Sequence, residues 1–461
     1  MKVKVKNLGV LKQAEFSLGD LTIICGGNNT GKTYATYALF GFLLLWEETF
    51  SIEISDQEID TLLDKGTITI NLLEYLDRIN TIIAKACENY TELLPKVFAS
   101  SEDYFQTTEF RIELDVNDNK LDQGHKQSIS TATTELFFIS KNAEDTDLIV
   151  NLLSEDKNIG LPKKVIKKII SDAIKEIVFS PFLPRPFIAS AERTGTAIFR
   201  KELNFARNRL LEEISQTDKD INPLELLSKG YDDYALPIKS NVEFTRKIES
   251  IAKRKSFILN EYPELIKDFT DIIGGSYLVT STDELYYVPK GKKIRLSMDE
   301  SSSAVRSLLD IGFYIKHQAQ KGDLLIIDEP ELNLHPENQR RVARLLARLV
   351  NLGIKIFITT HSDYIIKELN TLIMLNKDKS YLKEIAEKEG YKEEEFLTTN
   401  QVKVYVAERT LVKLDGHKKR TRCHTIIEAN ITPDLGIEVP SFDTAIETMN
   451  RIQEAIIWGE E

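Results

Sequence analysis

Three segments of the sequence contain residue types that can act on a nucleotide. The first, residues 26–33, matches the pattern Gly-x-x-x-x-Gly-Lys-Thr. In such a loop, backbone N–H groups surround phosphates, the lysine contacts the β- and γ-phosphates, and the threonine hydroxyl binds Mg²⁺. ATP and Mg²⁺ are therefore the predicted ligands. The predicted nucleotide-binding residues are Gly26, Gly27, Asn28, Asn29, Thr30, Gly31, Lys32 and Thr33, and Thr33 is also a predicted metal ligand.

The second segment is an apolar run, residues 324–327, that ends in two carboxylates, Asp328 and Glu329. The carboxyl end of a buried parallel strand is where ligand-binding groups gather. We expect Asp328 to bind Mg²⁺ and Glu329 to polarise the attacking water as a general base. Taken alone, the run also fits a strand that simply ends in a charged turn.

The third segment is another apolar run, residues 354–360, which ends in His361. A neutral imidazole at this place can donate to the γ-phosphate and link it to the catalytic carboxylate. A lone histidine after a strand is more often a structural residue. His361 follows Glu329 by 361 − 329 = 32 positions, and this order favours the catalytic role.

Short strands and one helix must position the phosphate-binding loop. Residues 3–6, 14–18 and 21–25 alternate or are continuously apolar, which predicts three strands before the loop. The apolar stretch 34–46 predicts a buried helix directly after it and is too short to cross a bilayer. A strand, a glycine-rich turn and a helix, in that order, are the context that a phosphate-binding loop requires.

Composition and charge restrict the protein classes. The 461 residues carry 72 acidic and 60 basic side chains, a net charge of −12, so binding to nucleic acid would need a local basic patch. Residues 290–295 and 417–422 are two such clusters, but neither is interleaved with aromatic residues. A solvated turn or a contact with an acidic partner is the favoured interpretation of both clusters.

The cysteines and the N-terminus indicate the compartment. Cys25, Cys87 and Cys423 are an odd number without metal-site spacing, which suits a reducing environment and predicts no structural zinc. The N-terminal residues alternate charges with valines and contain no apolar core of a signal peptide. We therefore expect a cytoplasmic protein with no membrane segment.

Together the motifs resemble those of ABC-type ATPases of the RecF, SMC and OLD group. The resemblance is carried by GGNNTGKT at 26–33, DEPELNLHP at 328–336 and THSDYI at 360–365. The segment ASAERTG, residues 189–195, resembles a stretch with an arginine in members of this group from bacterial anti-phage defence, such as the ATPase subunits of the PARIS and Septu systems. The resemblance implies an ATPase that dimerises when two heads sandwich two nucleotides.

In this group each nucleotide site is completed by a signature segment from the opposite subunit. The resemblance places that segment at residues 299–308, with Ser302 and Ser303 as predicted γ-phosphate ligands. A serine-rich helix cap is the alternative. Ala304 stands where the group has a glycine, so hydrolysis is expected to be slow or the composite site differently arranged. Arg193 is predicted to reach phosphate or the other subunit, with a solvated salt bridge as the alternative.

Lys32 and Asp328 are 328 − 32 = 296 positions apart, so a large insertion must split the nucleotide-binding core. The predicted fold class is α/β, an ABC-type ATPase head with a split P-loop core, an N-terminal antiparallel β lobe and a helical insertion. Helices at about 194–214 and 242–273, joined by a polar loop at 216–237, predict an antiparallel arm, and a β-meander follows it. The predicted segments are an N-terminal lobe (1–46), a mixed α/β insertion (47–180), the arm and meander (181–290), a C-terminal lobe (291–376) and a small α/β extension (377–461).

The segment after Met374 shows none of the acidic patterns of the Toprim nuclease that OLD-like chains carry. We therefore expect regulation of a separate effector nuclease, of Toprim or HNH type, by a homodimer or larger homo-oligomer. The main alternative is a RecF-like repair ATPase that binds DNA directly; DNA binding is possible but not favoured. A scaffold that binds nucleotide and scarcely hydrolyses it is a third interpretation, which Ala304 favours.

Overall fold

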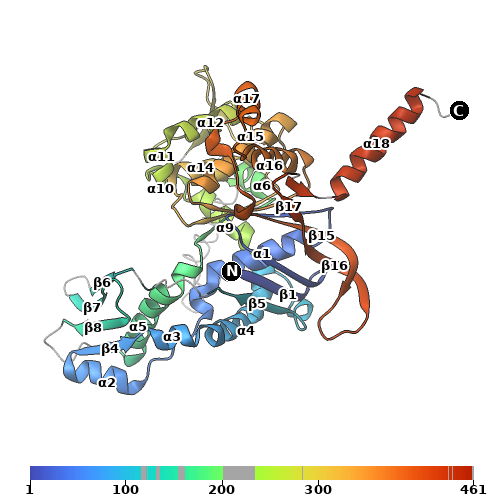
Figure 1. Cartoon of the computed structure of the whole chain (residues 1–461). Helices are drawn as coiled ribbons and strands as arrows, with labels where there is room; N and C mark the ends of the chain where they lie inside the picture. Colours follow the sequence, from blue (N-terminus) through green and yellow to red (C-terminus); the bar gives the residue numbers. More distant parts are fainter. Residues whose placement is uncertain are drawn as a thin grey trace, which may run out of the picture. The chain divides into compact units, whose positions relative to one another are not determined.

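The computed structural model describes residues 1–115, 121, 123–130, 135–153, 161–200, 234–282, 284–434, 436–438 and 440–458. It divides into two compact units, which are described separately (Figure 1). Unit 1 comprises residues 1–4, 42–93 and 109–184, and unit 2 comprises residues 5–41, 94–108 and 185–461. Across the described ranges, none of the helices combines the length and apolar character that a membrane span needs.

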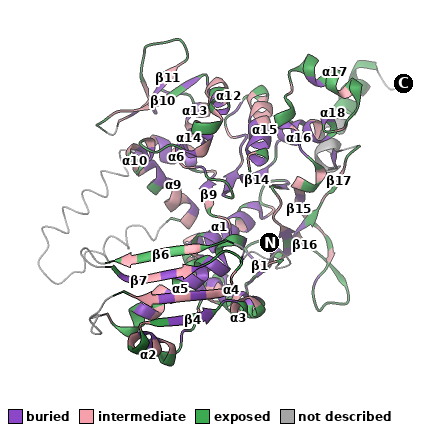
Figure 2. Ribbon diagram, turned by 60° about the vertical axis from the view of Figure 1, so that its left-hand side comes forward, coloured by how far each residue is buried: buried purple, intermediate pink, exposed green. Residues whose placement is uncertain are grey.

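Unit 1 contains an antiparallel sheet with strand order β4-β8-β7-β6. Its strands are β4 (Thr67–Asn71), β8 (Asp147–Leu152), β7 (Glu135–Lys141) and β6 (His125–Ser130). Buried and exposed residues alternate along β4, as they do in a sheet with one solvated face (Figure 2). The unit also contains the amphipathic helix α5 (Lys163–Val178), which buries Ile166, Ile170 and Ile174.

The core of unit 2 consists of four neighbouring parallel strands. They are β3 (Leu21–Cys25), β14 (Lys355–Thr360), β13 (Leu324–Asp328) and β9 (Pro186–Ala189), in that order. Every residue of β3 and β13 is buried, which explains their continuously apolar sequences. The parallel directions bring the carboxyl ends of all four strands to one edge. The predicted α/β fold with a nucleotide core split between distant chain segments is confirmed.

On its other side, β3 is paired with residues from the segment that was expected to form a separate C-terminal extension. β15 (Val402–Lys413) lies parallel to β3, and β16 (Arg420–Glu428) pairs antiparallel with β15. The sheet order continues through β16 to β2 (Leu11–Ser17) and β1 (Lys2–Leu8). Residues 402–413 form one continuous strand. Residues 402–413 and 420–428 therefore complete the central sheet.

The predicted long helix at 242–273 is also corrected. Four shorter helices are present instead: α9 (Leu236–Arg246), α10 (Ile248–Ala252), α11 (Phe257–Glu261) and α12 (Pro263–Ile273). Ser256 caps α11 and Pro263 begins α12, so the chain turns at both places. Ile248, Ile258 and Leu265 are fully buried in the core of unit 2, as an exposed arm would not bury them.

The predicted helix at 194–214 begins as α6 (Arg193–Ile198), and its remainder, like most of the predicted loop 216–237, lies outside the described residues. The predicted meander is confirmed as β10 (Gly275–Val279), β11 (Leu285–Pro289) and β12 (Leu296–Ser297). The remaining elements are α1 (Lys32–Thr49), α2 (Asp56–Lys65), α3 (Leu73–Asp77), α4 (Ile79–Phe98), β5 (Glu109–Glu113), α13 (Ser303–Ser307), α14 (Leu309–His317), α15 (Pro336–Asn351), α16 (Asp363–Leu375), α17 (Ser380–Glu389), β17 (Asn430–Thr432), β18 (Gly436–Glu438) and α18 (Pro440–Trp458).

Candidate nucleotide-binding site

The loop between β3 and α1 has the backbone geometry of a phosphate-binding turn. Gly26 has φ = 139° and Gly31 has φ = 103°. Residues other than glycine rarely adopt these values, because their Cβ atom clashes with the backbone. A Cβ atom on Gly26 would lie 2.3 Å from the carbonyl oxygen of Ala407 in β15, so the glycine is also needed for close packing. Strand β15 thus supports the loop from behind.

Lys32 is the first residue of α1 and is 6% exposed. Its Nζ donates to the carbonyl oxygens of Gly26 (2.9 Å) and Gly27 (2.8 Å), so the ammonium lies inside the loop. Burial lowers the pKa of Lys32, while the negative charges of Glu329, Asp328 and Glu331 act in the opposite direction. The site therefore holds a desolvated cation facing the carboxylates at the end of β13.

Asp328, at the end of β13, is 2% exposed. Its Oδ1 accepts a hydrogen bond from the Thr359 hydroxyl of β14, and its Oδ2 has no hydrogen-bond partner among the described residues. Burial is the main cause that raises the pKa of Asp328 to about 6. A buried carboxylate oxygen without a partner fits the predicted role of binding Mg²⁺ with Thr33. No group of three or more His, Cys, Asp or Glu side chains arranged to hold a metal occurs within the described ranges.

Glu329 and His361 come together although 32 positions separate them. Nδ1 of His361 lies 3.5 Å from Oε1 of Glu329 and 3.7 Å from Oε1 of Glu331. The Glu329 side chain is 25% exposed and that of His361 43%, so both can reach a ligand in solvent. Glu329 has φ = 54°, and its N–H donates to the carbonyl oxygen of Thr359 at 3.1 Å, which fixes this unusual conformation.

The structure excludes one of the two interpretations of Arg193, and contact with phosphate or the other subunit stays a prediction. Its side chain is 1% exposed, so the solvated salt bridge is wrong. The guanidinium donates to four backbone carbonyl oxygens. Three of these belong to residues at or just after the ends of β9 and β13. The acceptors are Ser190 (2.8 Å), Ser307 (2.7 Å), Asp328 (2.6 Å) and Glu329 (2.7 Å). The geometry gives Arg193 a positioning role for Asp328 and Glu329.

Asp310 of α14 is one of the negative charges that act on Arg193. It is 1% exposed and neither carboxylate oxygen has a hydrogen-bond partner within the described part of the chain. Burial raises the pKa of Asp310 from 3.8 to about 7, and the charge of Arg193 only partly opposes this shift. Above that pKa the folded state must keep a buried carboxylate ionised, which costs stability.

We therefore expect Asp310→Asn to stabilise the protein increasingly as pH rises. A raised folded-state pKa means that the folded state holds the proton more tightly. The stability cost of ionising Asp310 in the parent protein therefore grows as the pH rises from the unfolded-state pKa to the folded-state pKa. The free energy of unfolding of the variant minus that of the parent should increase by about 3 kcal/mol between about pH 5 and about pH 8. Urea unfolding of both proteins at the two pH values measures it. A difference that does not change with pH would contradict the assignment.

The predicted signature serines begin α13. Ser302 is exposed and its Oγ accepts from the N–H of Val305 at 3.3 Å, which is the cap contact of the alternative interpretation. Oγ of Ser303 accepts from the guanidinium of Arg306 at 3.1 Å. Within one chain both serines thus have local structural contacts, and a role towards a second subunit stays a prediction. Leu308 separates α13 from α14.

Sequence reasoning missed three contributors to this edge of the sheet. Glu331 accepts from the Thr360 hydroxyl and from the N–H of His361, both at 2.8 Å, and so fixes the histidine backbone. The Tyr37 hydroxyl of α1 donates to Oε2 of Glu192 at 3.0 Å. Glu192 is among the charges that raise the pKa of Asp328, so it adds a fourth carboxylate to Asp328, Glu329 and Glu331. An acidic residue three positions after a strand was the available signal for Glu192.

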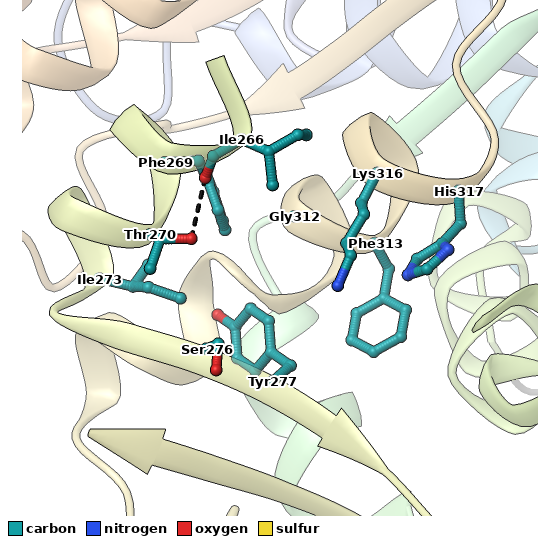
Figure 3. A pocket seen from close by; sticks show the side chains of 10 residues that line it. All are labelled: Ile266, Phe269, Thr270, Ile273, Ser276, Tyr277, Gly312, Phe313, Lys316 and His317. Carbon is teal, nitrogen blue, oxygen red and sulfur yellow. Dashed lines mark hydrogen bonds between the residues drawn. The ribbon is translucent and has the colours of Figure 1, made fainter. Parts of the chain in front are cut away.

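A separate pocket lies on unit 2, away from these residues (Figure 3). It is formed by α12, β10 and α14. Aromatic and aliphatic side chains such as Phe269, Tyr277 and Phe313 line it, with Lys316 beside them (Figure 3). None of the predicted site residues borders it, so the nucleotide site is identified by its chemistry rather than by this cavity.

A model of the AAA ATPase domain family, AAA_15, matches residues 1–366. The chain belongs to this family. The ATPase class predicted from the motifs is thereby confirmed, and the matched AAA ATPase domain contains the loop at 26–33, Asp328, Glu329 and His361. No curated protein matches the chain significantly.

Solved structures similar to this AAA ATPase domain protein include three SMC heads. One is an SMC head bound to the C-winged helix domain of ScpA (11% identity, TM-score 0.32, 93% of this chain and 97% of that chain covered). Another is the SMC head domain from Thermotoga maritima (10%, 0.28, 93% and 98%). The third is an Smc head with an extended coiled coil bound to the C-terminal domain of ScpA, from Pyrococcus furiosus (13%, 0.29, 98% and 98%). These scores are too low to assign a function.

Proposed function

We propose that the protein binds and hydrolyses ATP with Mg²⁺ and that two copies associate through their nucleotide-binding faces. The observation that carries the proposal is the meeting of three chain segments at one edge of the parallel sheet. That edge contains the loop with Lys32, the carboxylates Asp328 and Glu329, and His361 beside Glu329. A cation for phosphates and an adjacent carboxylate for water are what ATP hydrolysis requires.

In this proposal each residue has a separate task. Lys32 and the loop N–H groups hold the phosphates, while Thr33 and Asp328 hold the metal. Bound Mg²⁺ would neutralise the charge that develops on the phosphates. Glu329 orients the attacking water and accepts its proton, and His361, 3.5 Å from Glu329, keeps that carboxylate in place and faces the γ-phosphate. Arg193 holds the backbone that carries both carboxylates.

The dimer part of the proposal concerns Ser302. This serine is exposed at the start of α13, where its hydroxyl and the neighbouring N–H groups can meet a nucleotide held by a second copy. We expect Ser302→Arg to prevent ATP-dependent dimerisation, because the arginine side chain would occupy the space of the nucleotide held by the second copy. Nucleotide binding to the single chain should stay intact. Light scattering with a non-hydrolysable ATP analogue measures the mass.

The matched control is Ser281→Arg, which adds the same charge at another exposed serine. The control should dimerise like the parent. If the parent stays monomeric with the analogue at every protein concentration, the dimer part of the proposal is wrong. Hydrolysis is tested independently by phosphate release.

The finer proposal is that this cytoplasmic ATPase regulates a separate effector nuclease in anti-phage defence. It is supported by the resemblance of residues 26–33, 189–195 and 328–336 to ATPase subunits of such systems. The neighbouring open reading frame is the observation that tests it.

A further inference from the structure

The outer half of the β15–β16 hairpin carries an arrangement that the proposed function does not use. Residues Val402–Val406 of β15 pair with β3, whereas Arg409–Lys413 pair with Arg420–His424 of β16. These last two segments, called the ribbon below, form a two-stranded extension of the sheet, which belongs to the hairpin labelled β15 and β16 in Figure 1. They include residues 420–422 of the second basic cluster, with the cations Arg420 and Arg422.

The register places the basic residues of the ribbon on one face. Side chains directly opposite each other in an antiparallel pair point to the same side, and alternate residues along a strand do so too. Lys413 is opposite Arg420, Leu411 is opposite Arg422, and Arg409 is opposite His424. The other face carries the uncharged side chains of Thr410, Val412, Thr421 and Cys423.

The cationic face is solvent-exposed and lacks neutralising partners. Arg409, Lys413, Arg420 and Arg422 are all exposed, as the hairpin shows in Figure 2, whereas Val412 and Cys423 are half-buried. Within the described ranges, none of these four cations has a carboxylate partner. Like charges directly opposite each other destabilise a strand pair. In a chain of net charge −12, this concentration calls for an anionic ligand.

Contacts near both ends of the ribbon fix its orientation. The Thr425 hydroxyl donates to the carbonyl oxygen of Gln13 at 2.6 Å, and the Asp415 N–H donates to Oε1 of Gln13 at 3.0 Å. Lys6 forms an ion pair with Asp415 at 3.0 Å. The hairpin is thus attached to β1 and β2, and the cations are presented on a positioned surface rather than on a free loop.

We propose that the cationic face of the ribbon binds the phosphate backbone of duplex DNA. Cations spaced by two residues lie about 7 Å apart along a strand, and each one that neutralises a phosphate adds salt-dependent affinity. A two-stranded ribbon fits the major groove of a duplex. The face contains no Phe, Tyr or Trp to stack on unpaired bases, which favours a duplex over a single strand.

The rival basic cluster differs in structure. Lys292, Lys293 and Arg295 lie in the connection between β11 and β12, and Lys290 at its start is paired with Asp271. That cluster is a short exposed connection rather than a register-aligned face. It therefore supplies a matched control with the same change of charge.

The test is binding of a fluorescently labelled short DNA duplex to the full chain, followed by anisotropy. With four phosphates neutralised, log K should fall with log salt at a slope of about −4. Arg420→Glu together with Arg422→Glu should weaken binding at least tenfold and reduce that slope by about two, because two contacts are lost. The double variant Arg420→Gln and Arg422→Gln should weaken binding less, and Lys292→Glu with Lys293→Glu should leave it unchanged. ATP binding and circular dichroism verify folding of each variant.

Three results would overturn the proposal. The first is a parent protein that does not bind the duplex at low salt. The second is an equal loss of affinity in the Lys292 and Lys293 control, which would show a general charge effect. The third is polyglutamate of matched charge displacing the duplex as well as unlabelled duplex does, which would identify an acidic protein as the partner. Each result is independent of nucleotide hydrolysis, so the proposed ATPase function stands or fails separately.

Discussion

Lys32→Ala is expected to weaken ATP binding by roughly 100-fold or more, because the site loses its only buried cation aimed into the phosphate-binding loop among the residues that the structure describes. The ammonium lies between two loop carbonyl oxygens, where it can exchange these contacts for phosphate oxygens. Charge-assisted hydrogen bonds are about twice as strong as neutral ones, and burial strengthens them further. Fluorescence titration with a labelled ATP analogue measures the loss.

The same substitution should scarcely change the stability of the nucleotide-free protein. Burial lowers the pKa of Lys32, which means that the folded state pays to keep this charge despite three nearby carboxylates. Removing the ammonium relieves that cost and loses two hydrogen bonds, so the melting temperature should change little. Lys12→Ala is the matched control, since Lys12 is exposed on β2, and it should bind ATP like the parent. Parent-like binding by the Lys32 variant would show that the loop does not bind the nucleotide.

The local parts of this site can be predicted from the sequence because each of them requires particular residue types at neighbouring positions. A fully buried parallel strand must be apolar along its whole length, and both β3 and β13 are. The loop after β3 needs glycine where φ is positive, at Gly26 and Gly31. These requirements concern neighbouring residues only, so one sequence suffices to locate them.

Long-range partners are not encoded in this way. β15 lies parallel to β3 although about 380 residues separate them, and nothing in the apolar pattern of 402–407 specifies which strand it joins. The same holds for Arg193, whose four acceptors are backbone carbonyl oxygens. Any residue type can supply a carbonyl, so no motif marks the acceptors. The arginine was recognised, but its role required the fold.

The helix predicted at 242–273 shows a third kind of difference. Its apolar periodicity is real, yet Ser256 and Pro263 interrupt it with a cap and a new first turn. Each signal is weak alone. The burial of Ile248 and Leu265 in the core stabilises short packed helices more than local propensity stabilises one long helix.

Glu329→Gln is expected to reduce ATP hydrolysis by about 10² to 10⁴-fold, the contribution typical of a general base. The amide keeps the size of the side chain and removes the proton acceptor. Binding of ATP should remain, because Lys32 and the loop are unchanged. Phosphate release and retention of radiolabelled ATP after gel filtration measure the two quantities. Glu337→Gln, at an exposed glutamate at the start of α15, is the matched control and should hydrolyse ATP like the parent.

Glu329 and Glu331 are both candidates for the general base, since Nδ1 of His361 lies within 3.7 Å of a carboxylate oxygen of each. Substitution of each glutamate by glutamine distinguishes the two candidates. Glu331 is 7% exposed on its side chain and accepts two hydrogen bonds from Thr360 and His361, so it is engaged in holding β14. Glu329 is 25% exposed, and among the residues that the structure describes no N–H or O–H group donates to its carboxylate, which leaves it available to a water molecule. Glu329→Gln should therefore trap ATP in an otherwise intact site. Glu331→Gln should instead lower the melting temperature. If Glu329→Gln turns over like the parent while Glu331→Gln traps ATP, the general base is Glu331 and the exposed carboxylate has another role.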